Sequence, residues 1–215
     1  MAGCFSFTVL RDQCYHISFV NAGMKSKLLD LGDGTTMHCW VPKKTRDKPS
    51  LLLIHGLGAN AMWQWNSQIR PFRRHFNIYV PDLIFFGKSF TTRPERTEIF
   101  QAQTVMKMME ILGLTKFHVV GVSYGGFVAY NLAYLYPDAV QKVILVASGV
   151  CLEEKDMEEG LFKISDLTTA ISILLPQTAT NLKTLMKMSF FRAPKIIPSC
   201  FLKDFINNMV IDRRE

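Results

Sequence analysis

The sequence predicts an α/β protein in which a mostly parallel sheet is covered by helices and followed by a helical cap. Two observations predict this class: short apolar runs alternate with helix-like segments, and the pattern changes after Ser148 to helical segments alone. Strands that are almost continuously apolar are typical of a parallel sheet buried on both faces. The 215 residues, 48% of them hydrophobic, suit one domain with an attached lobe.

Four apolar runs are expected to form parallel strands. They are LLLIH at 51–55, NIYVPD at 77–82, FHVVGV at 117–122 and KVILVAS at 142–148. Helices are expected between them, at 59–70, 97–112 and 123–136. Upstream, Asp33-Gly34 between two alternating runs predicts a hairpin.

Three regions follow from this pattern. Residues 1–27 form an N-terminal segment, 28–150 a core with the first six strands of the sheet, and 151–215 an incomplete helical cap or lid. In the cap, Ser165-Asp166 is expected to cap a helix that runs to Leu175. A later helix is expected to place apolar side chains on one face: Phe201, Leu202, Phe205, Ile206, Met209 and Val210.

Composition excludes several classes of protein. The net charge is +7 but no arginine-rich block occurs, which indicates a solvated basic face and no nucleic-acid partner. The five cysteines are widely spaced and lack metal-ligand spacing, so we expect neither a metal nor another cofactor, and reduced thiols in the cytoplasm; organelle targeting stays open. The uncharged stretch 117–137 has the length of a membrane span, but its glycines favour a strand, a turn and a helix.

Ser123 is the candidate nucleophile. It stands in Gly121-Val122-Ser123-Tyr124-Gly125, directly after an expected strand and before an expected helix. A serine on such a sharp turn needs neighbours without bulk at the two glycine positions, and the following helix directs its N-terminal amides toward it. The alternative is an ordinary glycine-rich turn, and the strand and helix around the motif favour the nucleophile.

A second glycine-rich loop closes the strand at 51–55. In His55-Gly56-Leu57-Gly58, small residues allow backbone amides to face a reacting oxygen. We expect the amides of Leu57 and Tyr124 to form an oxyanion hole. His55, Gly56 and Gly58 would support it, together with Gly121 and Gly125. Without Ser123, a plain strand-to-helix loop would be the better interpretation.

These motifs occur in the order of a known family. HGLG at 55–58, Pro81-Asp82-Leu83 with Gly87 and Ser89, GVSYGG at 121–126 and YPDAVQKVILVAS at 136–148 resemble the α/β-hydrolase superfamily. The resemblance is closest to plant lipase-like members related to abhydrolase-domain monoacylglycerol lipases. One departure is Phe85-Phe86, which replaces a glycine-containing form of the loop after Asp82.

The resemblance implies hydrolysis of a carboxylic ester through an acyl-enzyme at Ser123. Epoxide hydrolases and haloalkane dehalogenases of this fold carry an aspartate at that position, so their ester intermediate is excluded. The cap is rich in methionine and phenylalanine, which indicates a small apolar ester as the substrate. Contact with a membrane surface is compatible with this, without a transmembrane segment.

The expected catalytic base is missing. In this fold the triad follows the order Ser, then acid, then His, but all five histidines precede Ser123: His16, His38, His55, His75 and His118. His118 should lie ~16 Å from Ser123 along the strand. His55 is the one serious substitute, and we expect it to support its loop instead.

Carboxylates offer no triad acid either. Asp82 is expected to brace its loop. The acidic residues of the cap are expected to be solvated: Asp156, Asp166, Asp204 and Asp212.

The resemblance implies that two more strands and a final helix carry the acid and the histidine, so we expect a truncated product. Two functions remain open: a serine hydrolase impaired in this chain, and a non-catalytic pseudo-hydrolase that binds an apolar ligand or partner.

Overall fold

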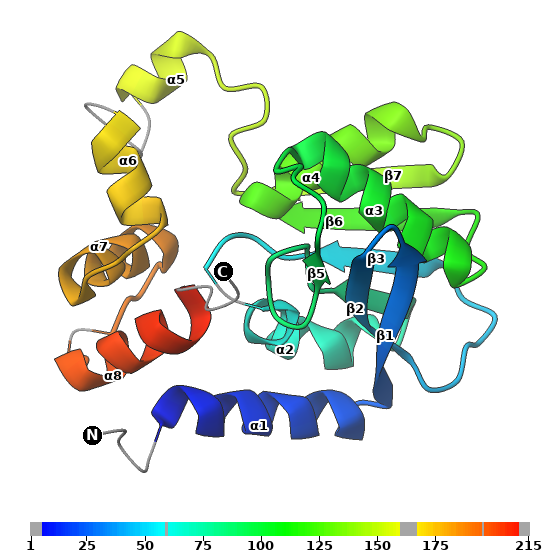
Figure 1. Ribbon diagram of the computed structural model, residues 1–215, viewed down its shortest axis with the longest axis horizontal. Helices are drawn as coiled ribbons and strands as arrows, with labels where there is room; N and C mark the ends of the chain where they lie inside the picture. Colours follow the sequence, from blue (N-terminus) through cyan, green and yellow to red (C-terminus); the bar gives the residue numbers. More distant parts are fainter. Residues whose placement is uncertain (1–5, 59, 160–166, 195, 211–215) are drawn as a thin grey trace. The chain divides into compact units, whose positions relative to one another are not determined.

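The computed structural model describes residues 6–58, 60–159, 167–194 and 196–210 (Figure 1). The chain folds into two compact units. The larger is Cys14–Val150, and the smaller combines Met1–Gln13 with Cys151–Glu215. The change of pattern in the sequence after Ser148 therefore falls close to the point where the chain leaves the larger unit.

The larger unit is built on a seven-stranded sheet whose main path has the order β1-β2-β4-β3-β6-β7. Its strands are β1 (Met24–Gly32), β2 (Thr35–Pro42), β3 (Ser50–Ile54), β4 (Asn77–Pro81), β5 (Phe90–Thr91), β6 (Phe117–Val122) and β7 (Val140–Val146). β4, β3, β6 and β7 run parallel, whereas β2 pairs antiparallel with β1, β4 and β5. The four predicted parallel strands are confirmed. β5 was not predicted, because two residues are too few for a periodic signal.

The predicted hairpin is confirmed between β1 and β2. Asp33 and Gly34 both have positive φ, 52° and 68°, which is the conformation of a type I′ turn. This turn matches the twist of the paired strands. β1 begins at Met24, a few residues before the expected start of the core.

Helices cover both faces of the sheet, and the three predicted helices are confirmed as α2 (Ala61–Phe72), α3 (Glu98–Ile111) and α4 (Tyr124–Leu135). α3 and α4 lie on one face, while α2 and the second half of α1 (Phe7–Asn21) lie on the other (Figure 1). α1 was not predicted, because its turns lack a clear amphipathic pattern. Its end is held by Phe19, which packs against the ring of Trp40.

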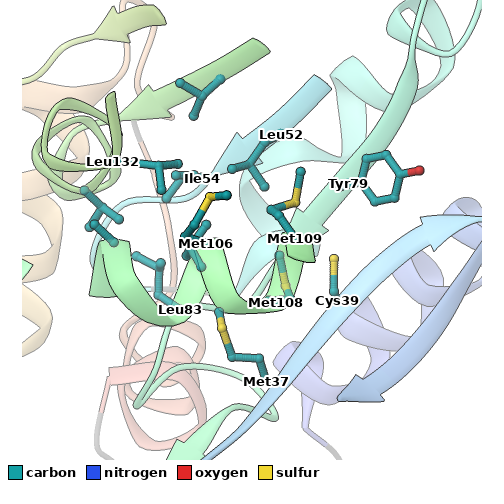
Figure 2. Packing of buried hydrophobic residues seen from close by; sticks show 14 of the residues in the cluster. Met37, Cys39, Leu52, Ile54, Tyr79, Leu83, Met106, Met108, Met109 and Leu132 are labelled. Carbon is teal, nitrogen blue, oxygen red and sulfur yellow. The ribbon is translucent and has the colours of Figure 1, made fainter. Parts of the chain in front are cut away.

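Methionine side chains fill the space between α3 and the sheet. Met106, Met108 and Met109 lie among residues of β2 and β3, including Leu52 and Cys39 (Figure 2). Unbranched thioether side chains adapt to irregular gaps, which suits a helix that crosses a twisted sheet. Burial raises the pKa of the Cys39 thiol, so this cysteine stays protonated and acts as a small apolar side chain.

The smaller unit contains α5 (Glu154–Glu159), α6 (Leu167–Leu174), α7 (Ala179–Ser189), α8 (Ser199–Phe205) and a π-helical turn at Ile206–Val210. No strand occurs among its described residues. The predicted apolar face holds in part: Leu202 and Ile206 are buried with Leu182 of α7. Phe201 instead stacks on Phe7, with ring centroids 4.9 Å apart. The expected cap at Ser165-Asp166 lies outside the described residues.

The expectation that Asp204 is a solvated charge is wrong, because its carboxylate is engaged in hydrogen bonds within the smaller unit. It accepts hydrogen bonds from the amide of Thr8 (2.8 Å) and the hydroxyl of Ser6 (3.0 Å), at the first turn of α1. Burial raises its pKa, but these hydrogen bonds outweigh that effect and hold the pKa below its usual value. The sequence could not show this contact because its partners are about 200 residues apart along the chain.

β7 leaves one edge of the sheet unpaired. Among the described strands it pairs with β6 alone, as expected from the sequence, and its apolar residues are exposed. The exposed fractions are 38% for Val143, 56% for Ile144, 40% for Leu145 and 43% for Val146. Natural edge strands usually carry a charge, a proline or a bulge that blocks pairing. Val143 to Val146 carry no charge and no proline.

We therefore predict that the purified chain self-associates through β7. Replacing Ile144 with lysine should shift the mass measured by size-exclusion chromatography with light scattering toward the monomer, because a lysine on an edge strand opposes pairing. Ile99→Lys is the matched control, since Ile99 is 49% exposed but lies on α3. A monodisperse wild-type monomer would show that the edge is covered in solution.

Candidate active site

Ser123 lies on the turn between β6 and α4 in a strained backbone conformation. Its φ is 53° and its ψ is −120°, values that L-residues rarely adopt and that cost on the order of 1–3 kcal/mol. The turn is held on both sides, because Ser123 N donates to Val146 O and Gly126 N donates to Ser123 O, both at 2.9 Å. The Ser123 side chain does not cap α4. Its hydroxyl is thus not consumed by the helix that follows.

Two glycines allow the backbone of α4 to approach the strands beneath it. A Cβ atom on Gly125 would lie 2.5 Å from the carbonyl oxygens of both Ile54 and His55, and one on Gly121 would lie 2.2 Å from Gly125 O. Neither gap admits a methyl group. The expected requirement for small residues on both sides of Ser123 therefore has a direct steric cause.

Gly126, in the first turn of α4, was not among the predicted site residues. A Cβ atom there would lie 2.4 Å from the Cβ and Oγ atoms of Ser148, just beyond β7. The Ser148 hydroxyl is buried and has no hydrogen-bond partner among the described residues. The signal in the sequence was the doubled glycine of GVSYGG, whose second member fixes the packing of α4 on β7.

The loop after β3 lies directly against Ser123. A Cβ atom on Gly56 would be 2.9 Å from Ser123 Cβ and 3.5 Å from Ser123 Oγ. Gly58 has a φ of +87° and open space around its Cα, so conformation and not crowding demands a glycine there. Leu57, between these glycines, and Tyr124, the first residue of α4, thus belong to the two backbone segments that meet at Ser123.

His55 is fully buried, and both of its ring nitrogens are engaged. Nε2 accepts a hydrogen bond from the Leu83 amide (2.9 Å), so Nδ1 carries the proton and donates to Gly56 O (2.7 Å). Burial lowers the pKa of His55, despite the opposing effect of the Asp82 charge. The imidazole is therefore neutral at pH 7, and the lone pair that a base would use is already occupied.

The other four histidines also lie within the described residues, at other places in the larger unit. His38 contacts Asp82 and Ser26, and His16 packs edge-on against Trp40. His75 lies in the exposed turn before β4, and His118 lies at the start of β6. In the described part of the chain, no histidine forms a hydrogen bond with the Ser123 hydroxyl.

Asp82 braces the end of β4, as expected. Its carboxylate accepts hydrogen bonds from His38 Nδ1 (2.8 Å), Ala61 N (2.9 Å) and Lys88 N (3.1 Å). Burial raises its pKa, but the contact with His38 and the backbone amide outweigh this, and the pKa is lowered overall. Gly87 leaves room for the carboxylate, since a Cβ atom there would lie 2.1 Å from Asp82 Oδ2.

Phe85 and Phe86, the departure from the family pattern, shape the loop that follows Asp82. Phe85 has a φ of 76°, in the region that favours glycine, and this agrees with a glycine-containing loop in related proteins. The guanidinium of Arg96 lies over the Phe85 ring, 4.0 Å from its centroid. The Phe86 ring meets His55 edge-on at 5.2 Å. Packing contacts thus offset a strained backbone next to the His55 loop.

Burial raises the pKa of Tyr124 to about 12, so its phenol is uncharged at neutral pH.

Over the described residues, no group of three or more His, Cys, Asp or Glu side chains is placed to hold a metal ion. Nor does any described helix have the length and apolarity to cross a membrane.

We predict that Asp82→Asn destabilises the larger unit by about 3 kcal/mol at pH 7, because it replaces a buried carboxylate that accepts hydrogen bonds from His38, Ala61 N and Lys88 N. Since the folded pKa lies below the ordinary value of 3.8, the carboxylate stabilises the fold above that pH. This stability is lost as the pH falls through the folded pKa. The difference in stability between the wild type and the variant, measured by urea unfolding, should therefore begin to shrink below about pH 4 and close only below the folded pKa.

Asp47→Asn, at an exposed position, is the matched control for Asp82→Asn and should leave the stability unchanged. A constant difference between wild type and Asp82→Asn from pH 7 to about pH 3 would contradict the assignment of a charged brace.

Comparisons with known proteins agree with this arrangement. A family model described as alpha/beta hydrolase fold matches residues 49–169. An uncharacterised protein of Mycobacterium bovis is 34% identical over 101 residues, which are 47% of this chain and 29% of that protein. Mouse epoxide hydrolase 4 is 27% identical over 111 residues, 50% of this chain and 30% of that protein.

Solved structures match over more of the chain. A crystal structure described as a putative lipase from Acinetobacter baumannii has a TM-score of 0.74 and 25% identity, over 93% of this chain and 64% of that one. The chain spans about a third of the length of the two curated relatives. The family model covers more than half of the chain and includes Ser123 and the loop at 55–58. The chain belongs to the alpha/beta hydrolase family.

Proposed function

We propose that the chain is a serine hydrolase of carboxylic esters in which Ser123 is the nucleophile. The observation that carries this proposal is the strained Ser123 turn, whose hydroxyl does not cap α4 and which lies against the glycine loop at 55–58. A strained, half-buried serine between a strand and a helix is typical of a nucleophile. The putative lipase with the same fold supports an ester as the substrate.

In the proposed reaction, Ser123 Oγ attacks the ester carbonyl carbon, and the carbonyl oxygen becomes an oxyanion. The amides of Leu57 and Tyr124 would donate hydrogen bonds to it, because Leu57 follows Gly56 and Tyr124 N is a first-turn amide without a partner in the helix. Expulsion of the alcohol leaves an acyl-serine, and water then releases the acid. The serine proton must pass to a base and onward to the alcohol.

No histidine of this chain is available as that base, so we propose that ester hydrolysis by the chain is impaired. His55 begins the glycine loop at 55–58, but its Nε2 already accepts a hydrogen bond from the Leu83 amide. Removing the base from a serine triad can cost about 10⁶ in kcat, while an oxyanion hole and binding retain roughly 10³–10⁴ over the reaction in water. A slow acylation with little turnover is the expected behaviour.

The substrate would be a small ester with an apolar acyl group. The exposed aromatic and methionine side chains of the smaller unit support this, as does the lipase relative. We include peripheral contact with a membrane surface in the proposal. We also propose a cytosol-like compartment, which the unpaired cysteines Cys14, Cys39, Cys151 and Cys200 support.

A second candidate is a pseudo-hydrolase that binds an apolar ligand or partner without turnover. One observation favours it: in the described part of the chain, none of the five histidines forms a hydrogen bond with the Ser123 hydroxyl. The two candidates differ in the reactivity of Ser123. A nucleophile without a base still reacts slowly with a strong electrophile, whereas an inert turn residue does not.

We predict that Ser123 reacts with a fluorophosphonate probe, slowly compared with a complete triad, and that Ser123→Ala abolishes the labelling. Ser67→Ala is the control, because Ser67 is exposed on α2 and away from any strained turn. Intact-mass spectrometry with peptide mapping gives both the rate and the site. Labelling that is equal in Ser123→Ala would refute the nucleophile, and rapid turnover of a nitrophenyl ester by the wild type would refute the impairment.

A further inference from the structure

The smaller unit exposes aromatic and apolar side chains between α7 and α8. We name Phe190, Phe191, Arg192 and Ile196 the α7–α8 tip. Their apolar members are unusually open to solvent: Phe191 is 98% exposed, Ile196 90% and Phe190 56%. Scattered apolar residues on a surface are common, but aromatic rings exposed this fully in one short loop mark an interaction site.

The tip is held in place from its inner side. Phe190 N donates to Met186 O at 3.0 Å, which ties it to the last turn of α7. Ile197, next to the exposed Ile196, points the other way and packs on the buried cluster of Leu182, Leu202 and Ile206. Adjacent isoleucines thus divide the loop into an anchored side and an open side. The exposed side chains of the tip are therefore held in place by the buried cluster beneath Ile197.

Basic residues lie on both sides of the tip along the chain. Lys183 and Lys187 lie exposed on α7, Arg192 lies in the tip and Lys203 lies on α8. None of these four forms an ion pair within the described residues. The nearby carboxylate, Asp204, is directed at the first turn of α1 through Thr8 N. The guanidinium of Arg192 lies 5.7 Å from the centroid of the Phe191 ring.

We propose that the α7–α8 tip is a membrane-docking element that inserts Phe191 and Ile196 into the surface of an anionic bilayer. Phenylalanine and other large apolar side chains on a surface element bury themselves at the boundary between headgroups and acyl chains. Lysines and an arginine beside them attract acidic headgroups. This combination of exposed apolar and basic side chains fits a unit that lies on a membrane surface. The inference gives the membrane contact of the proposed function a defined surface.

The charge pattern favours a lipid surface over a protein partner. A protein interface usually pairs its aromatic anchors with a polar rim of both signs. Here the rim on α7, the tip and α8 is basic, and the single acidic residue of this stretch, Asp204, has its own partners. An extended surface of one sign, such as an acidic leaflet, complements it better.

The test measures flotation of the full chain with vesicles of phosphatidylcholine, with and without phosphatidylserine. The Ser123→Ala background removes any ester chemistry, so failure to bind lipid and failure of the proposed hydrolysis are read separately. The background should float with phosphatidylserine vesicles. Phe191→Ala with Ile196→Ala should lower the partition coefficient about tenfold or more, because two large apolar side chains no longer leave water.

Charge reversal gives a second arm. Lys187→Glu with Arg192→Glu should lower binding to phosphatidylserine vesicles and weaken its dependence on salt. Matched controls lie in the larger unit: Tyr134→Ala, at a ring that is 75% exposed on α4, and Lys116→Glu, at an exposed lysine. Both controls should bind like the background, and Phe191→Trp should retain binding.

Three results would overturn the proposal. They are no flotation of the background on acidic vesicles, undiminished flotation of the Phe191→Ala, Ile196→Ala variant, and equal losses in the Tyr134→Ala control. Capture of the tip by a soluble protein, without vesicle binding, would also overturn it in favour of a protein interface. Each substituted side chain of the tip is exposed, so thermal unfolding should stay at the wild-type temperature.

Discussion

The close backbone contact between the first turn of α4 and the end of β3 is the constraint on which the site depends. Gly125 leaves only 2.5 Å between a notional Cβ atom and the carbonyl oxygens of Ile54 and His55. With the helix this close, the link from β6 to α4 must turn sharply, and Ser123 takes a positive φ. The same approach brings Gly56 against Ser123. The strained backbone of Ser123 and the position of the glycine loop therefore both result from the close packing of α4 on the sheet. Gly121 and Gly126 allow the same close packing.

Buried polar groups hold the loops around this turn. Asp82 joins β2, the start of α2 and the loop before Ser89, and His55 joins the amide of Leu83 to the carbonyl of Gly56. Buried hydrogen-bonding groups are costly when unpaired, so these side chains are committed to structure. This commitment has a chemical consequence. The His55 imidazole, next to the glycine loop that lies against Ser123, has both its proton and its lone pair engaged, so it positions this loop.

Much of the larger unit could be predicted from the sequence. The continuous apolar strands, the Asp33-Gly34 turn and the glycines around Ser123 each impose a local physical requirement that the residues themselves reveal. What escaped prediction depends on contacts distant in the chain: the pairing of β5 with β2, the packing of Phe19 on Trp40 that holds α1, and the reach of Asp204 to Thr8. Gly126 escaped because its need for space arises from Ser148, on another element. The positive φ of Phe85 shows the reverse case, in which packing overrides a local preference.

The central claim is that Ser123 is a built nucleophile without an imidazole to activate it. The measurement that tests it most directly is the pH dependence of Ser123 phosphonylation, followed by intact mass between about pH 6 and pH 9. Without a neighbouring base, the rate should rise about tenfold per pH unit with no plateau, as hydroxide becomes available. A rate that levels off with an apparent pKa near that of histidine, about 6.5, and that loses this inflection in His55→Ala, would contradict the account.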